Sequence, residues 1–126
     1  MIIDSDVLIN FLRNEPSALR AIESLNENNE KLITTSINSY ELLKGVSRFS
    51  KVKQEQVRSF LTNFVVLDFD FKSSEKAAEI FNFLKEAGNP LDIADIMIAS
   101  IAITNNQPLL TQNKKHFERI NELKFA

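Results

Sequence analysis

Three carboxylates in this sequence stand where an unpaired acid is energetically out of place. Asp4 ends a short apolar run, Glu41 interrupts an apolar stretch, and Asp95 has apolar residues three, four and seven positions after it. A carboxylate in such surroundings is costly unless something pairs with it, and carboxylates brought together raise one another's pKa. A divalent cation reverses the sign of that interaction. Because oxygen ligands suit Mg²⁺ or Mn²⁺, the three acids together predict metal-assisted hydrolysis of a phosphodiester.

Two of these acids also have a purely structural explanation. Asp4 is equally well placed to cap the helix expected after it. Glu41 lies three residues after Asn38, which fits a capping box whose Glu bonds back to the cap residue. Both interpretations stay open from local sequence alone.

Asp92 and Asp95 differ from each other in this respect. If Pro90 is the first residue of a helix, Asp92 is the third, where the helix dipole favours a carboxylate. Asp95 then lies one turn further in, beyond the reach of capping. No Lys or Arg occurs between Lys85 and Lys114 to pair with it. Asp95 is therefore the acid for which a functional role is predicted most strongly.

The elements that must position these acids alternate between strand-like and helix-like patterns, which predicts a parallel sheet with helices on its faces. Asp4 follows the first strand, and the carboxyl ends of parallel strands are where ligands gather. Ser36 and Asn89 are expected as helix N-caps, and Gly88 closes the helix before Asn89. The expected strands cover 1–3, 31–35, 64–67, 108–111 and an edge near 123–125, and the helices cover 36–46, 51–63, 73–87 and 90–102.

Composition limits the class of protein. The chain has 126 residues, 44% of them hydrophobic and 25% charged, which predicts one globular domain over residues 1–126. No apolar run approaches the length of a membrane span, so a soluble cytoplasmic protein without membrane contact is expected. The absence of cysteine excludes disulfides, thiolate zinc sites and a Cys nucleophile. A net charge of −2 is unlike that of a duplex-coating nucleic-acid binder, so RNA binding would depend on metal ions or local basic patches.

Four segments together resemble the PIN domain family, and more narrowly the VapC toxins of prokaryotic toxin-antitoxin pairs. They occur in family order, with family-like spacing, over essentially the whole chain. They are Ile2-Ile3-Asp4-Ser5-Asp6-Val7-Leu8-Ile9, Ser39-Tyr40-Glu41-Leu42-Leu43-Lys44-Gly45, Ala94-Asp95-Ile96-Met97-Ile98-Ala99-Ser100, and Leu109-Leu110-Thr111-Gln112-Asn113-Lys114-Lys115-His116-Phe117.

The resemblance implies a three-layer α/β/α sandwich around a small, mainly parallel sheet of four to five strands. It also implies a Mg²⁺- or Mn²⁺-dependent endoribonuclease in which Asp4, Glu41 and Asp95 bind metal. Asn113 takes the position of a fourth acidic or polar catalytic residue, and its neutral oxygen leaves one-ion and two-ion schemes open. Supporting roles are expected for a further group of polar residues, namely Asp6, Asp92 and Thr111.

Partners follow from the same resemblance. The family usually forms homodimers, and a VapB-like antitoxin blocks the site and binds promoter DNA, so DNA is an indirect partner. Ten Phe residues leave apolar surface for a dimer face or an antitoxin groove. Basic residues beside the acids are expected to steer the RNA backbone, namely Lys44, Arg48, Lys114 and Lys115. His116, the one histidine, is expected to have a surface or packing role.

Two other hypotheses compete with the nuclease. Asp4-Ser5-Asp6 matches the Asp-x-Asp start of haloacid-dehalogenase-like phosphotransferases, although Val7-Leu8 follows where that class has Gly-Thr. The other is a non-catalytic RNA- or protein-binding module of the PIN fold. The presence of all three acids, Asp4, Glu41 and Asp95, argues against a PIN-fold module that has lost its catalytic activity.

Overall fold

A parallel four-stranded sheet lies at the centre of the computed structural model, which describes residues 1–126. Its strands are β1 (Ile2–Ile3), β2 (Ile33–Thr35), β3 (Val65–Leu67) and β4 (Leu109–Leu110), in the spatial order β3-β2-β1-β4. The chain therefore adds strands on one side of β1 and then returns to the other side for β4. The carboxyl ends of β1 and β4 flank this reversal, the position where open α/β sheets bind ligands.

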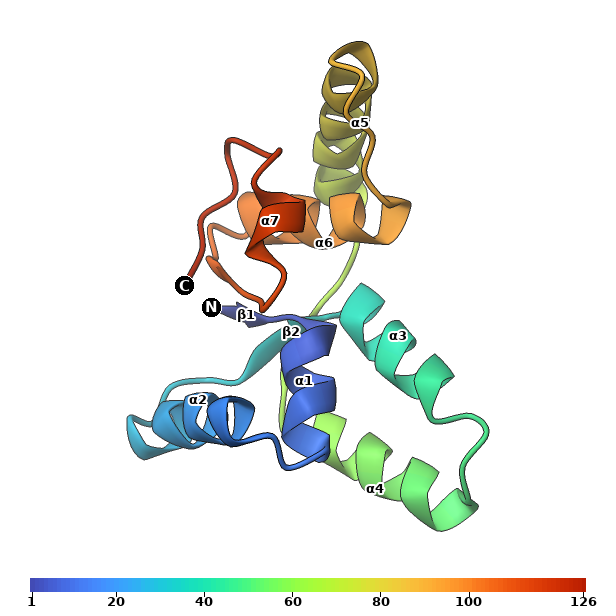
Figure 1. Cartoon of the computed structure of the whole chain (residues 1–126), viewed down its shortest axis with the longest axis vertical. Coiled ribbons are helices and arrows are strands. Elements are labelled where there is room, and N and C mark those ends of the chain that lie inside the picture. The colour runs from blue at the N-terminus through green and yellow to red at the C-terminus, as the bar shows by residue number, and fades with distance from the viewer.

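Helices cover both faces of the sheet, giving the α/β/α sandwich (Figure 1). One layer holds α5 (Phe71–Glu86), α6 (Ile93–Thr104) and the short α7 (Lys114–Phe117). The other holds α1 (Ser5–Leu12), α2 (Pro16–Glu27), α3 (Ser36–Gly45) and α4 (Lys51–Leu61). The predicted fold class is confirmed, and the fifth strand is reduced to a single parallel bridge between Leu109 and Phe125.

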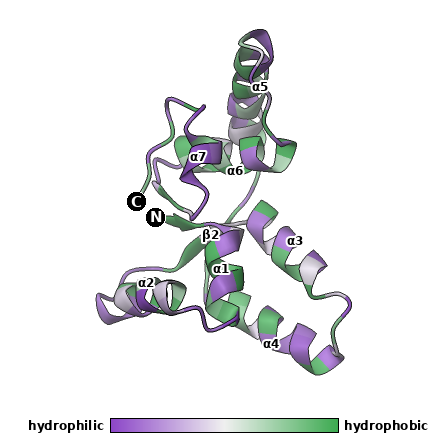
Figure 2. Ribbon diagram, viewed as in Figure 1, coloured by the Kyte–Doolittle hydropathy of each residue, from purple (hydrophilic) through white to green (hydrophobic).

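The sheet divides the hydrophobic core in two. Ile2 belongs to a cluster with α5, α6 and Phe117, whereas the next residue, Ile3, belongs to a cluster with α1, α2 and α4. This alternation follows from the two-residue period of a strand. Figure 2 shows the strands in green, between helices in which green and purple residues alternate. Both isoleucines are fully buried, so β1 is held rigidly from both faces.

Several helix starts differ from the predicted ones. Thr35, and not Ser36, is the N-cap of α3, because its hydroxyl accepts a hydrogen bond from the Asn38 amide at 3.1 Å. Asp70 caps α5, which begins two residues earlier than predicted. The predicted start of α6 at Pro90 is wrong, since α6 begins at Ile93 with Asp92 as its N-cap.

Two helices were not predicted. α2 begins with Pro16 after the cap Glu15, whose carboxylate accepts hydrogen bonds from two backbone amides of the first turn. A proline at the first helical position was the available sequence signal. α7 is only four residues long, too short for a periodic pattern. None of the helices combines the length and apolar character needed to cross a membrane.

Candidate active site

Asp4 lies at the tip of β1, and its side chain accepts three hydrogen bonds. Oδ1 accepts from the backbone N–H of Ser5 and from Nδ2 of Asn38, both at 2.8 Å. Oδ2 accepts from the Thr111 hydroxyl at 2.7 Å. The first contact is a cap of α1, so the two alternatives for Asp4 are compatible: it caps a helix and also lies among the other candidate groups.

Glu41 reaches the same place from α3. Its Oε1 accepts a hydrogen bond from the Ser5 hydroxyl at 2.8 Å, and Ser5 Oγ in turn accepts from Nδ2 of Asn38. The capping-box interpretation of Glu41 is wrong, because Asn38 is already inside the helix and Thr35 supplies the cap. Ser5 therefore joins the β1 tip to the acid on α3.

Thr111 and Asp6 close the third side of this arrangement. The Thr111 hydroxyl lies 2.7 Å from Asp4 Oδ2 and 3.2 Å from Asp6 Oδ2, and Asp6 also accepts from the Gln112 amide at 3.0 Å. The backbone N–H of Asn113 donates a hydrogen bond to Thr111 Oγ1 at 3.0 Å. The Asn113 side chain is exposed and makes no hydrogen bond. Asp4 and Asp6, which are separated by Ser5 alone, thus share the Thr111 hydroxyl as a hydrogen-bond partner.

Asp95 has a partner that local sequence could not reveal. Its Oδ2 lies 3.0 Å from Nδ1 of His116, on the short helix α7. Nδ1 is buried and has no other polar partner, and its alignment with Asp95 falls outside that of a regular hydrogen bond. This contact with Asp95 was not predicted for His116, for which a surface or packing role was expected. Asp95 is also in the first turn of α6, closer to the helix start than predicted.

The acids influence one another electrostatically. The pKa of Asp4 is raised to about 6, first by burial and then by the nearby negative charge of Asp6. The hydrogen bonds that Asp4 accepts from Thr111, Ser5 and Asn38 oppose this rise. Burial also raises the pKa of Asp95; His116 opposes this rise, whereas Asp92 and Glu41 add to it. No Lys or Arg forms an ion pair with any of these acids. The negative charge at this end of the sheet is therefore left largely uncompensated.

This donor set fits a hard divalent cation chemically, since it offers carboxylate, hydroxyl and amide oxygens and no sulfur. No three acidic or histidine side chains lie together as a ready-made metal-binding group. The side chains therefore do not converge on one point. Mg²⁺ commonly binds through one or two carboxylates and keeps several waters. Asp4 retains one free lone pair, on Oδ2, and Glu41 retains an unbonded Oε2, which is compatible with that mode.

The four predicted RNA-contacting cations are all exposed and pair with no acid. Lys44 lies over the ring of Tyr40, with Nζ 5.3 Å from the ring centroid, one helical turn beyond Glu41. Lys114 and Lys115 follow Asn113 directly at the start of α7. Arg48 lies just after α3. None of these cations neutralises the acids.

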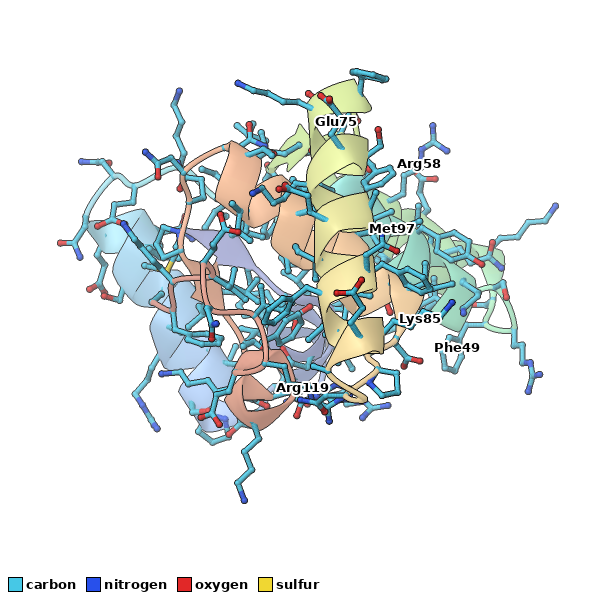
Figure 3. The ribbon with its side chains drawn as sticks, turned by 90° about the horizontal axis from the view of Figure 1, so that it is seen from above. Phe49, Arg58, Glu75, Lys85, Met97 and Arg119 are labelled. Carbon is cyan, nitrogen blue, oxygen red and sulfur yellow. The ribbon has the colours of Figure 1, made fainter.

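A groove of about 330 Å³ opens next to Glu41, between α1, α3 and α4. Its walls include Ile9, Leu12, Val46 and Phe49. The Phe49 side chain is 56% exposed and projects at the edge of the molecule (Figure 3). The groove thus joins an apolar surface to one of the candidate carboxylates.

The comparison with known families decides the assignment. Residues 1–123 match the model of the PIN domain. The chain belongs to the PIN domain family. The hypothesis of a haloacid-dehalogenase-like phosphotransferase is therefore dropped. The PIN-domain assignment predicted from four short segments is confirmed over almost the entire chain.

Within the family, this PIN domain is similar to VapC ribonucleases. It is 35% identical to "Ribonuclease VapC1" of Methanocaldococcus jannaschii, over 97% of this chain and 82% of the relative. It is 27% identical to the "tRNA(fMet)-specific endonuclease VapC" of Shigella flexneri, over 97% of this chain and 92% of the relative. Both relatives are named as enzymes that cut RNA.

Solved structures give the same grouping. The PIN domain superposes on a chain of a DNA-bound VapBC from Salmonella typhimurium with a TM-score of 0.88 and 27% identity, covering 99% and 95% of the two chains. It superposes on a chain of VapBC2 from Rickettsia felis, bound to a promoter DNA fragment, with a TM-score of 0.84 and 30% identity, covering 99% and 96%. Both neighbours are toxin-antitoxin complexes.

Sequence reasoning missed Asn38, Ser5 and the pairing of His116 with Asp95. Asn38 is fully buried and lies three residues before Glu41, on a neighbouring part of the same helix face. A polar side chain at that spacing from a candidate ligand was the available signal. His116 had no such signal, because α7 approaches α6 only through the tertiary fold.

Proposed function

We propose that this protein is a metal-dependent endoribonuclease, the toxin of a toxin-antitoxin pair, with Asp4, Glu41 and Asp95 holding one or two Mg²⁺ or Mn²⁺ ions. The observation that carries the proposal is an uncompensated group of acids at the topological switch point of the sheet. Its relatives named as ribonucleases support RNA as the substrate.

The bound ion would lower the pKa of a water molecule and balance negative charge on the scissile phosphate. The chain's own groups have distinct tasks beside it. Asp4 presents the remaining lone pair of Oδ2 and Glu41 presents its unbonded Oε2, while Thr111 and Ser5 fix the orientation of Asp4 and Glu41 respectively. Asp6 and Asp92 strengthen the local negative potential, and Asn113 offers a neutral oxygen at the rim of the site.

The surroundings of the acids are suited to RNA. Lys44, Arg48, Lys114 and Lys115 are free to contact phosphates, which supplies a salt-dependent part of the affinity. We propose that the protein acts on its RNA substrates in the cytoplasm.

Two apolar surfaces suit the expected protein partners. The groove lined by Ile9, Leu12, Val46 and Phe49 would receive a segment of a VapB-like antitoxin, which then covers Glu41. A second hollow, of about 250 Å³, lies between α5 and α6 and includes Phe81, Ile93 and Met97. Figure 3 shows Met97 beside α5. This face would form the homodimer, and contact with promoter DNA would pass through the antitoxin.

The test is an RNA cleavage assay with the purified protein freed of antitoxin. Total cellular RNA is incubated with Mg²⁺, with Mn²⁺ or with EDTA, and the new ends are sequenced. We expect cleavage with either metal, none with EDTA, and none with Asp4→Asn or Asp95→Asn. Asp68→Asn, at an exposed carboxylate after β3, is the matched control and should cut like the wild type. Absence of cleavage with both metals would refute the proposal.

A non-catalytic PIN module would give a different outcome in the same experiment. It would bind RNA or a protein partner without producing new ends, and chelation would leave binding unchanged. The names of the similar proteins favour the enzyme.

A further inference from the structure

Asn38 is fully buried in α3, and every hydrogen bond of its side chain goes to a group near the acids or to the helix cap. Nδ2 donates to Asp4 Oδ1 and to Ser5 Oγ, both at 2.8 Å. Oδ1 accepts from the Thr35 hydroxyl at 2.7 Å. A buried amide with this many partners has one orientation, because turning it over would place its oxygen against the Asp4 carboxylate.

The consequence for Asp4 follows from counting lone pairs. A carboxylate has about four acceptor positions, two on each oxygen. Oδ1 uses both of its positions, one for the Ser5 amide and one for Asn38. Oδ2 uses one for Thr111 and keeps one free. Asp4 can therefore offer a cation a single lone pair, from Oδ2.

The second contact of Asn38 extends this control to Glu41. Ser5 Oγ accepts the Asn38 hydrogen bond and must then donate its own proton elsewhere, and the acceptor is Glu41 Oε1 at 2.8 Å. One buried amide thus constrains two of the three proposed metal ligands, which come from different elements of the fold.

We propose that Asn38 is a positioning residue that restricts Asp4 to monodentate coordination and thereby selects small octahedral cations over Ca²⁺. This inference rests on the proposed function, since it concerns the cation that the acids would hold. Ca²⁺ accepts bidentate carboxylates and six to eight oxygens, whereas Mg²⁺ requires near-octahedral geometry at shorter distances. Removing Asn38 frees a lone pair on Asp4 Oδ1 beside the one on Oδ2, which makes bidentate binding available.

The test measures the affinities of the metal-free protein for Mn²⁺ and Ca²⁺ by calorimetric titration, without RNA. The variants are Asn38→Ala and Asn38→Ser, and both remove the amide nitrogen that donates to Asp4 and Ser5. Ser73→Ala is the matched control, because Ser73 is also fully buried and its hydroxyl bonds to Thr104 at 3.1 Å, away from the acids.

We expect the wild type and Ser73→Ala to prefer Mn²⁺ to the same degree. In a folded Asn38 variant the ratio of the two affinities should move toward Ca²⁺ by about tenfold, the scale on which groups behind metal ligands act. A ratio that changes less than twofold, even if both affinities fall, would overturn the inference and leave Asn38 a structural residue. If the wild type binds neither ion, the metal requirement of the proposed function fails first, and that result is distinct from an unchanged ratio.

Discussion

Replacing Asp4 with asparagine should make the protein more stable at neutral and alkaline pH while removing its activity. The pKa of the Asp4 carboxyl is raised from 3.8 to about 6, first because the group is buried and second because Asp6 is close. Each pKa unit corresponds to about 1.4 kcal/mol. Ionised Asp4 therefore costs the folded state about 3 kcal/mol relative to the unfolded chain.

The hydrogen bonds around Asp4 can survive this substitution. The amide oxygen can take the place of Oδ1 and accept from Ser5 N–H and Asn38. The amide nitrogen can then donate to Thr111 Oγ1, whose proton turns to Asp6 Oδ2 at 3.2 Å. Because no buried polar group loses its partner, the lost charge is the main change, and the gain should approach about 3 kcal/mol.

The pH dependence distinguishes this explanation from a general packing effect. Between about pH 4 and pH 6 the folded wild type holds more protons than the unfolded chain, so its free energy of unfolding falls as the pH rises. The Asp4→Asn variant lacks the part of this dependence that is due to Asp4 and keeps the part due to Asp95. The two proteins should be close in stability near pH 4 and furthest apart above pH 7.

The assay is denaturant unfolding and thermal unfolding of both proteins in EDTA at several values of pH between 4 and 8. At pH 8 the melting temperature of the variant should be higher by about 10 °C, the scale expected for 3 kcal/mol in a domain of this size. Asp68→Asn, an exposed carboxylate, should change stability by less than about 0.5 kcal/mol. A variant that is less stable than the wild type at pH 8, or a difference that is the same at pH 4 and pH 8, would refute the reasoning.

Three further predictions concern other parts of the chain. Changing Lys114 and Lys115 together to Ala should weaken RNA binding. It should also reduce the slope of log affinity against log salt concentration by the equivalent of up to about two phosphate contacts, measured by titrations at several salt concentrations. An unchanged slope would exclude these lysines from the interface. Leu84→Ala should destabilise the protein by about 2–5 kcal/mol, whereas Phe81→Ala should cost much less because Phe81 is 45% exposed and Leu84 only 2%; equal losses in denaturant unfolding would contradict the assignment of the core. Gly88→Ala should cost about 1 kcal/mol in the same assay, because Gly88 has φ of +67° and an added Cβ meets nothing within 4 Å; a stabilised variant would contradict that backbone conformation.

If the protein binds a metal ion as proposed, that ion should offset the loss of stability caused by ionised Asp4. A cation that binds only the folded protein offsets the repulsion among the acids and adds stability according to its concentration. Mn²⁺ should therefore raise the melting temperature of the wild type and leave Asp4→Asn almost unchanged.

Much of the fold could be predicted because its signals are local. The strand that carries Asp4, the helix that carries Glu41 and the closing role of Gly88 all follow from apolar spacing and residue preference. Helix starts were predicted less well, since several polar residues near each start can act as the cap. Thr35 takes that role in α3 because Asn38 completes its hydrogen bonds, and Ser36 becomes the first residue of the helix.

The sequence by itself determined which residues are available for chemistry: Asp4 after a buried strand, Glu41 and Asp95 among apolar neighbours, and no cysteine. These features depend on residue type and short-range spacing, which the chain carries in any conformation. Only the tertiary structure decided their partners. His116 meets Asp95, and Asn38 meets Asp4, because elements far apart in the chain end at one edge of a parallel sheet. Such contacts depend on strand order and helix packing, and no local pattern encodes them.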